Sequence, residues 1–190
     1  AYFKKFRLVE LQSSFYKLPK LETAEKWGRD APKGFEFTLK AFQAITHPAT
    51  SPTWKKAGIR VPLAKAERYG LLRPTDENLE AWEDTRRIAD ALNAKVVVVQ
   101  CPPTFTFSAT TVKDMRDFFN SINRGGLEIA WEPRNPTWVP EVVRNVCDEL
   151  SIIHVVDPFK EKTVTAHRGP IYYRLHGLGK RMYIYKYTDE

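Results

Sequence analysis

The run Lys95-Val-Val-Val-Val-Gln100, which Pro102-Pro103 ends abruptly, constrains the fold more than any other stretch of the sequence. A continuous β-branched run is typical of a strand buried on both faces, because a solvated face would place polar residues at alternate positions. Proline lacks the N–H that the next ladder hydrogen bond needs. Strands buried in this way occur in parallel sheets covered by helices, so the run predicts an α/β fold.

Strand-like and helix-like segments alternate along the rest of the chain. Thr75, followed by two acidic residues, predicts the start of a helix. Thr111 is a candidate N-cap for a second helix, Pro140 fits the first turn of a third, and a short helix is expected over residues 21–31. Six strands are predicted, over residues 7–12, 35–40, 95–100, 127–131, 152–156 and 171–175. This alternation favours a parallel sheet.

A long connection over about residues 41–74 separates the second predicted strand from the third. It contains four prolines and two glycines. A loop of this length usually carries function or short structure of its own. We expect one domain over residues 1–190, with this segment as an excursion over one mouth of the domain.

The composition fits a globular protein, with 43% hydrophobic and 28% charged residues in a chain of 190. No apolar run reaches the ~18 residues of a membrane span, and no signal-peptide pattern is present. Cys101 and Cys147 are too few for a disulfide scaffold, so we expect a cytoplasmic protein in which both are small buried hydrophobes. The net charge of +7 favours an anionic partner, or it reflects only a basic, well-solvated surface.

Polar side chains stand at the end of every predicted strand. In strand order they are Glu10, Lys40, Gln100, Glu132 with Arg134, Asp157, and Arg174 with His176. Active sites of (β/α) barrels lie at the C-terminal ends of the strands, whereas an open doubly wound sheet binds ligands only near a topological switch point. Polar residues at the ends of all six strands suit strands arranged in a ring, as in a barrel, better than strands arranged in a row, as in an open sheet. The sequence therefore predicts an α/β fold of the TIM-type (β/α) barrel.

Several motifs occur together in a characteristic order. They are Val9-Glu-Leu-Gln-Ser-Ser-Phe-Tyr-Lys-Leu-Pro19, Phe35-Glu-Phe-Thr-Leu-Lys40 with Ile45-Thr-His47, Gln100-Cys-Pro-Pro-Thr-Phe105, Glu132-Pro-Arg134 with Trp138, Asp157, Tyr173-Arg-Leu-His-Gly177 and Tyr185-Lys-Tyr-Thr188. Over essentially the whole chain this order resembles the domain of unknown function 72 family, the YecE-like TIM-barrel proteins. The resemblance implies a barrel with a site at its strand ends, and it implies no established activity.

Two departures from the family pattern bear on the barrel. Family members usually begin with a glycine-rich first strand, and nothing like it precedes Ala1. The family barrel also continues past Thr188 into a final helix and strand. Because a closed barrel needs every edge paired, we expect the first and last strands to be missing from this sequence; the alternative is an open partial barrel.

The predicted catalytic residues are Glu10, Lys40, Glu132, Asp157 and His176. Glu10 and Glu132 could form an acid/base pair, as in a hydrolase, lyase or isomerase, if their environments separate their pKa values. Alternatively, each forms a salt bridge with a basic neighbour. Lys40 could act as a Schiff-base nucleophile or could balance Glu10. His47, His176 and Asp157 with the two glutamates could hold a divalent metal, but no compact ligand spacing is present, so the cofactor stays open.

Arg134 and Arg174 are the main binding candidates, because a guanidinium fork matches phosphate or carboxylate. The alternative is that both arginines hold the glutamates. The remaining predicted substrate-binding residues are Tyr16, His47, Gln100 and Tyr187. Trp131, although close to the same mouth, is expected in the core.

Three functions remain open from the sequence. The leading one is an enzyme that binds a small anionic or polyhydroxy substrate at the barrel mouth. The second is a metal-dependent nuclease or phosphoesterase that acts on nucleic acid, and its binding would be salt-sensitive. The third is a non-catalytic binding protein that uses the same mouth. The oligomeric state is not set by the sequence.

Overall fold

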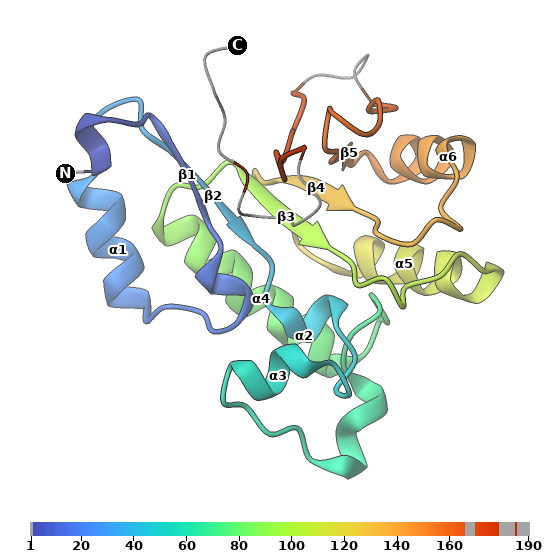
Figure 1. The fold of residues 1–190 in the computed structure, drawn as a ribbon. Helices are drawn as coiled ribbons and strands as arrows, with labels where there is room; N and C mark the ends of the chain where they lie inside the picture. The colour runs from blue at the N-terminus through green and yellow to red at the C-terminus, as the bar shows by residue number, and fades with distance from the viewer. Residues whose placement is uncertain (1, 166–169, 179–184, 186–190) are drawn as a thin grey trace.

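The computed structural model describes residues 2–165, 170–178 and 185, and its centre is one parallel sheet (Figure 1). Five strands form it, namely β1 (Leu8–Leu11), β2 (Glu36–Lys40), β3 (Val96–Gln100), β4 (Glu128–Glu132) and β5 (Ile153–His154). They lie in the order β1-β2-β3-β4-β5, and each neighbouring pair is parallel. Spatial order equal to chain order, without a reversal, is the winding of a (β/α) barrel rather than of a doubly wound sheet.

The four long helices fall between successive strands. They are α1 (Leu21–Asp30), α4 (Asp76–Ala91), α5 (Ala109–Ser121) and α6 (Pro140–Leu150). α1 packs on α4 and α5 packs on α6. Among the described residues β1 pairs only with β2 and β5 only with β4, so the sheet is an open sector and not a closed barrel.

The two faces of the strands belong to two separate apolar clusters. Leu39, Val97 and Trp131 point toward the helices and join their buried residues in the larger cluster. Val98 and Ala130 lie on the other face, in a small cluster with Ile153 and Val155. This second face corresponds to a barrel interior, and its strands end in the polar residues of the site.

Two predicted elements differ from the observed ones. The sixth strand, over residues 171–175, is reduced to one parallel bridge between Val156 and Tyr173. The Arg174 N–H donates to the Val156 carbonyl at 3.0 Å, and the side chains of Tyr172 and Arg174 bind Glu10, so side-chain contacts hold this segment in place of a ladder. The N-cap of α5 is Ser108 and not Thr111, because the Ser108 side chain accepts the hydrogen bond from the Thr111 N–H.

Other helix starts agree with the sequence. The Thr75 hydroxyl accepts from the Asn78 N–H at the start of α4, and Pro140 occupies the first turn of α6. Cys101 and Cys147 are both buried, as predicted. Within the part of the chain that the structure describes, no helix combines the length and the apolar character needed to cross a membrane.

The long connection between β2 and β3 has short structure of its own. It contains α2 (Gln43–Thr46), α3 (Pro52–Lys56) and the 3-10 helix η3 (Leu63–Arg68), and in Figure 1 α2 lies just beyond the arrowhead of β2. The Asn78 side chain fixes the last part of this connection through Gly70. Asn78 Oδ1 accepts from the Gly70 N–H at 3.0 Å, and Asn78 Nδ2 donates to the Gly70 carbonyl at 3.1 Å. A Cβ on Gly70 would lie 2.4 Å from the His47 carbonyl carbon, so only glycine allows this close packing.

Candidate functional site

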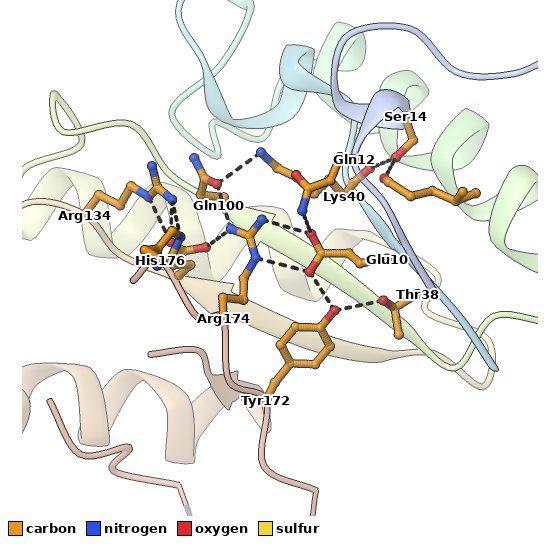
Figure 2. Close-up of polar contacts among 12 residues, drawn as sticks. Glu10, Gln12, Ser14, Thr38, Lys40, Gln100, Arg134, Tyr172, Arg174 and His176 are labelled. Carbon is orange, nitrogen blue, oxygen red and sulfur yellow. Dashed lines mark hydrogen bonds and ion pairs between the residues drawn. The ribbon is translucent and has the colours of Figure 1, made fainter. Parts of the chain in front are cut away.

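The ends of β1, β2 and β3 and the segment 171–176 enclose a cavity of about 970 Å³. Its polar lining includes Glu10, Tyr16, Lys40, His47, Gln100, Arg134, Arg174 and His176. Figure 2 shows that Glu10, Lys40 and Gln100, from three different strands, point toward Arg174. The structure therefore brings together eight of the predicted site residues.

Arg174 is the centre of the cluster. Its Nη2 lies 2.9 Å from Glu10 Oε1, and its Nη1 lies 2.5 Å from Glu132 Oε2. Nε donates to the second Glu10 oxygen at 3.1 Å, and Nη1 also donates to Gln100 Oε1 at 2.9 Å. The guanidinium fork is therefore occupied by protein acceptors, which corresponds to the structural alternative for Arg174.

Glu10 is surrounded by donors. Besides Arg174, Gln12 Nε2 donates to Glu10 Oε1 and the Tyr172 hydroxyl donates to Oε2 at 2.7 Å. Tyr172 in turn contacts the Thr38 hydroxyl at 2.8 Å. Burial and the Glu10 charge raise the pKa of Tyr172, so the phenol stays protonated and can keep donating. A carboxylate that accepts hydrogen bonds from four protein donors is fixed in position, and its oxygens are occupied by the protein.

Lys40 is only 7% exposed, and among the described residues no carboxylate lies within salt-bridge distance of it. Its Nζ donates to Gln100 Oε1 at 3.0 Å and lies 4.1 Å from the centroid of the Phe15 ring. Burial and the nearby Arg174 charge lower the pKa of Lys40 from 10.5 to about 8. The amine therefore titrates slightly above neutral pH. An amine that can gain or lose a proton there is suited to chemistry on a ligand.

His47 also packs against Phe15, edge to face, with ring centroids 4.7 Å apart. Its Nδ1 contacts the Thr46 hydroxyl at 2.8 Å. Burial, followed by the charges of Lys40 and Arg134, lowers the pKa of His47 to about 4. The imidazole is therefore neutral at neutral pH and can donate or accept a hydrogen bond.

A chain of polar contacts continues from Glu132 away from Arg174. Arg134 Nε donates to Glu132 Oε1 at 2.8 Å, and Arg134 Nη2 donates to His176 Nε2 at 3.3 Å. His176 Nδ1 then lies 3.5 Å from Asp157 Oδ2. Burial lowers the pKa of His176, so the ring is held neutral with its Nδ1–H toward Asp157. Arg134 Nη1 makes no hydrogen bond to the described residues, and the Arg134 side chain lines the cavity.

The remaining predicted residues are distributed unevenly. Glu132 and Asp157 line a second cavity, of about 460 Å³, which shares Arg134 and His176 with the first. Tyr16 lines the first cavity, and its hydroxyl accepts from Lys56 Nζ at 3.3 Å. Trp131 is fully buried in the helix-side core, as expected. Tyr187 lies outside the described residues.

The sequence interpretation missed several residues of the site. Tyr172 shares the two-residue alternation of Arg174 and His176, and this spacing could have revealed it. Phe15 stands in a recognised motif, but its contact with Lys40 depends on the η2 turn (Ser13–Phe15). The Ser14 hydroxyl fastens this turn by donating to the carbonyls of Leu11 and Lys40. No local pattern indicates either contact.

The predicted metal ligands do not form a metal cluster. Across residues 2–165, 170–178 and 185, no group of three or more His, Cys, Asp or Glu side chains is arranged to hold a metal ion. Glu10 and Glu132 are instead joined through Arg174.

A parallel sheet in sequential order, with helices between its strands and a polar cavity at the strand ends, defines a protein of the (β/α)-barrel class. The chain belongs to the family "Protein of unknown function DUF72", whose model matches residues 1–190. This membership confirms the resemblance drawn from the sequence motifs.

The relatives agree with this assignment. The chain is 41% identical over 139 residues to the UPF0759 protein YunF of Bacillus subtilis (strain 168), covering 73% of this chain and 43% of that protein. The chain thus matches less than half the length of this curated relative.

Solved structures of the same family share the fold. A DUF72 family protein from Thermotoga maritima MSB8 superposes with a TM-score of 0.64 at 24% identity, covering 97% of this chain and 68% of that one. Another, from Enterococcus faecalis V583, gives 0.62 at 21% identity, covering 93% and 68%. At these identities the structures establish the fold and carry no information on activity.

Proposed function

We propose that the residues at the strand ends form the substrate site of an enzyme that acts on a small anionic or polyhydroxy compound. The observation that carries the proposal is Lys40, a buried cation that faces the cavity without a carboxylate partner among the described residues. Burying a charge is costly unless it is paired, so an amine in this position is suited to a ligand that supplies the missing anion.

The neighbouring groups suit the same ligand. Arg134 lines the cavity, and the charges of Arg174 and Arg134 together balance those of Glu10 and Glu132, to which they are bound. The cluster of three basic and two acidic side chains therefore carries a positive excess when Lys40 is protonated. A negative ligand group between Lys40 and Arg134 would be held by charge-assisted hydrogen bonds.

Proton transfer would fall to Lys40 and His47 rather than to the two glutamates. The pKa of Lys40 is about 8, so the amine is mostly protonated at neutral pH. The pKa of His47 is about 4, so the imidazole is neutral there. Such a pair can supply an acid and a base in one site. Glu10 and Glu132 position Arg174 in this scheme.

A thermal-shift screen of phosphates, sugar acids, sugars and nucleotides tests the proposal. We expect at least one anionic class to stabilise the wild-type chain, by about 2.7 kcal/mol at a hundredfold excess over Kd. The Lys40→Met variant should lose most of this shift, whereas Lys113→Met, on an exposed face of α5, should retain it. If no compound stabilises the wild type, the proposal is wrong; salt-sensitive binding of nucleic acid alone would favour the nuclease alternative.

A further inference from the structure

Lys40 and Arg174 share one neutral acceptor. Lys40 Nζ lies 3.0 Å from Gln100 Oε1, and Arg174 Nη1 lies 2.9 Å from the same oxygen. Two cations at one amide oxygen repel each other. Losing a proton from the amine relieves this repulsion, because a guanidinium keeps its charge at any physiological pH.

Arg174 also withholds the carboxylates that Lys40 would otherwise use. Glu10 and Glu132 both bind the guanidinium, at 2.9 and 2.5 Å. Elsewhere the lysines that form ion pairs are exposed ones, such as Lys26 with Asp30 and Lys113 with Asp117. The site therefore contains a buried amine with a cationic neighbour, and these are the two conditions that activate lysine as a nucleophile.

We propose that Lys40 forms an imine with a small anionic carbonyl compound, such as a 2-oxo acid or an aldehyde acid. This inference rests on the proposed function, since the same cavity must first bind the anion. Arg134 lines the cavity, and its Nη1, which makes no hydrogen bond to the described residues, would take the carboxylate or phosphate of the ligand. The carbonyl carbon would then lie against Lys40 Nζ, which the Phe15 ring and Gln100 hold in place.

The reaction is a balanced condensation. The nitrogen lone pair attacks the carbonyl carbon, the π pair of the C=O bond moves to oxygen, and one proton passes from nitrogen to that oxygen to give a carbinolamine. The hydroxyl group then leaves with the second amine proton as water, and a C=N bond remains. No oxidant, metal or further reactant is needed, and water reverses the step.

The pH range for this chemistry depends on every charge that faces Lys40. These groups are Glu10 from β1, His47 after α2, Glu132 and Arg134 at the end of β4, and Arg174. The arginines oppose protonation and the glutamates favour it, while burial is the largest contribution. At about pH 7.5 an exposed lysine, with a pKa near 10.4, has far less free amine than Lys40.

Glyoxylate with cyanoborohydride tests the inference, because hydride reduction converts the imine into a stable carboxymethyl-lysine that peptide mapping locates. At about pH 7.5 we expect Lys40 to be modified at least about tenfold faster than the exposed lysines. Glycolate, which has an alcohol in place of the aldehyde, should slow the modification of Lys40 alone. Lys56→Met, which removes an exposed amine beside Tyr16, should leave the yield at Lys40 unchanged.

The outcomes separate this inference from the proposed function. Mapping of the wild-type chain needs no variant, so misfolding of Lys40→Met cannot obscure the result. Adducts spread over exposed lysines, without preference for Lys40, would overturn the inference. If Lys40 showed no preferential modification but glycolate or another anion still stabilised the wild type and not Lys40→Met, the anion site would stand without imine chemistry. If Lys40 showed no preferential modification and no anion stabilised the wild type, both the proposed function and the imine inference would be wrong.

Discussion

The two faces of the sheet carry opposite kinds of residue on the same strands. On the helix side, Leu39 and Trp131 are fully buried among apolar neighbours. One residue further along, on the other face, Lys40 and Glu132 are also buried but belong to the polar cluster of the site, in which Figure 2 labels Lys40. The two-residue period of a strand thus places the apolar core and the polar cavity within one residue of each other.

This contrast shows where stability and chemistry are located. Apolar burial on the helix side stabilises the fold in proportion to the area removed from water. The polar face gains little from its ion pairs after desolvation, and leaving one of its charges alone is costly. Substitutions on the two faces should therefore differ in what they damage.

The largest effect is expected on the helix side. Trp131 is 0% exposed and packs edge-on against Trp138 with centroids 4.9 Å apart. Replacing Trp131 by alanine leaves a cavity and should lower the free energy of unfolding by about 4 kcal/mol. Urea denaturation monitored by circular dichroism measures this free energy for the variant and the wild type. A loss below about 1 kcal/mol would mean that the helix side does not dominate stability.

The next largest effect is expected at Arg174. The variant Arg174→Met leaves Glu10 and Glu132 without their shared partner and should cost between about 3 and 4 kcal/mol. The matched control is Arg116→Met, whose partner Glu149 is exposed, and which should cost less than about 1 kcal/mol. If both variants lost the same free energy of unfolding, the Arg174 cluster would be as solvated as the surface pair, which would contradict this prediction.

The sequence predicted the helix side better than the site. The β-branched run at Val96–Val99 and the Thr75 cap are local signals, and both elements were placed correctly. The residues at the strand ends were also identified, since a parallel sheet brings such ends together. The alternative in which both arginines hold the glutamates matches the structure, but which arginine binds which glutamate could not be predicted, because Arg174 and Glu10 are 164 positions apart and the choice depends on side-chain geometry.

The expected sixth strand shows that local sequence can also predict an element that the structure does not form. Residues 171–175 have the composition of a strand, yet the structure contains only the Val156–Tyr173 bridge. Tyr172 and Arg174 reach the site through their side chains, and that tertiary contact has no counterpart in local propensity. Strand propensity mainly reports packing, so it cannot decide such a segment.

Lys40 should produce a pH dependence of stability. Its pKa is about 8 in the folded chain and 10.5 without the fold, so the unfolded chain binds more protons between these values. The free energy of unfolding should rise with pH from about 8 to about 10.5, by up to ~3 kcal/mol. Because other lysines also titrate, the quantity to measure is the difference from Lys40→Met, and a flat difference would contradict the shift.

A smaller loss is expected at Ser14, which links the ends of β1 and β2. Its hydroxyl donates to the carbonyls of Leu11 at 2.6 Å and Lys40 at 2.7 Å. Ser14→Ala should cost about 1–2 kcal/mol and weaken anion binding through a displaced Phe15 turn. Ser121→Ala is the control, because its bond to the Asp117 carbonyl is exposed. Calorimetric melting of both variants should rank Ser14 above Ser121, and the reverse order would contradict the link.

The most direct measurement is an NMR titration of the Lys40 side chain, with the Lys40→Met variant used for assignment. An amine buried beside Arg174 without a carboxylate should titrate with a midpoint near pH 8, and a bound anion should move this midpoint upward. A midpoint at or above about 10.4, unchanged by phosphate, sugar acids or glycolate, would mean an ordinary solvated or ion-paired lysine and would contradict the account.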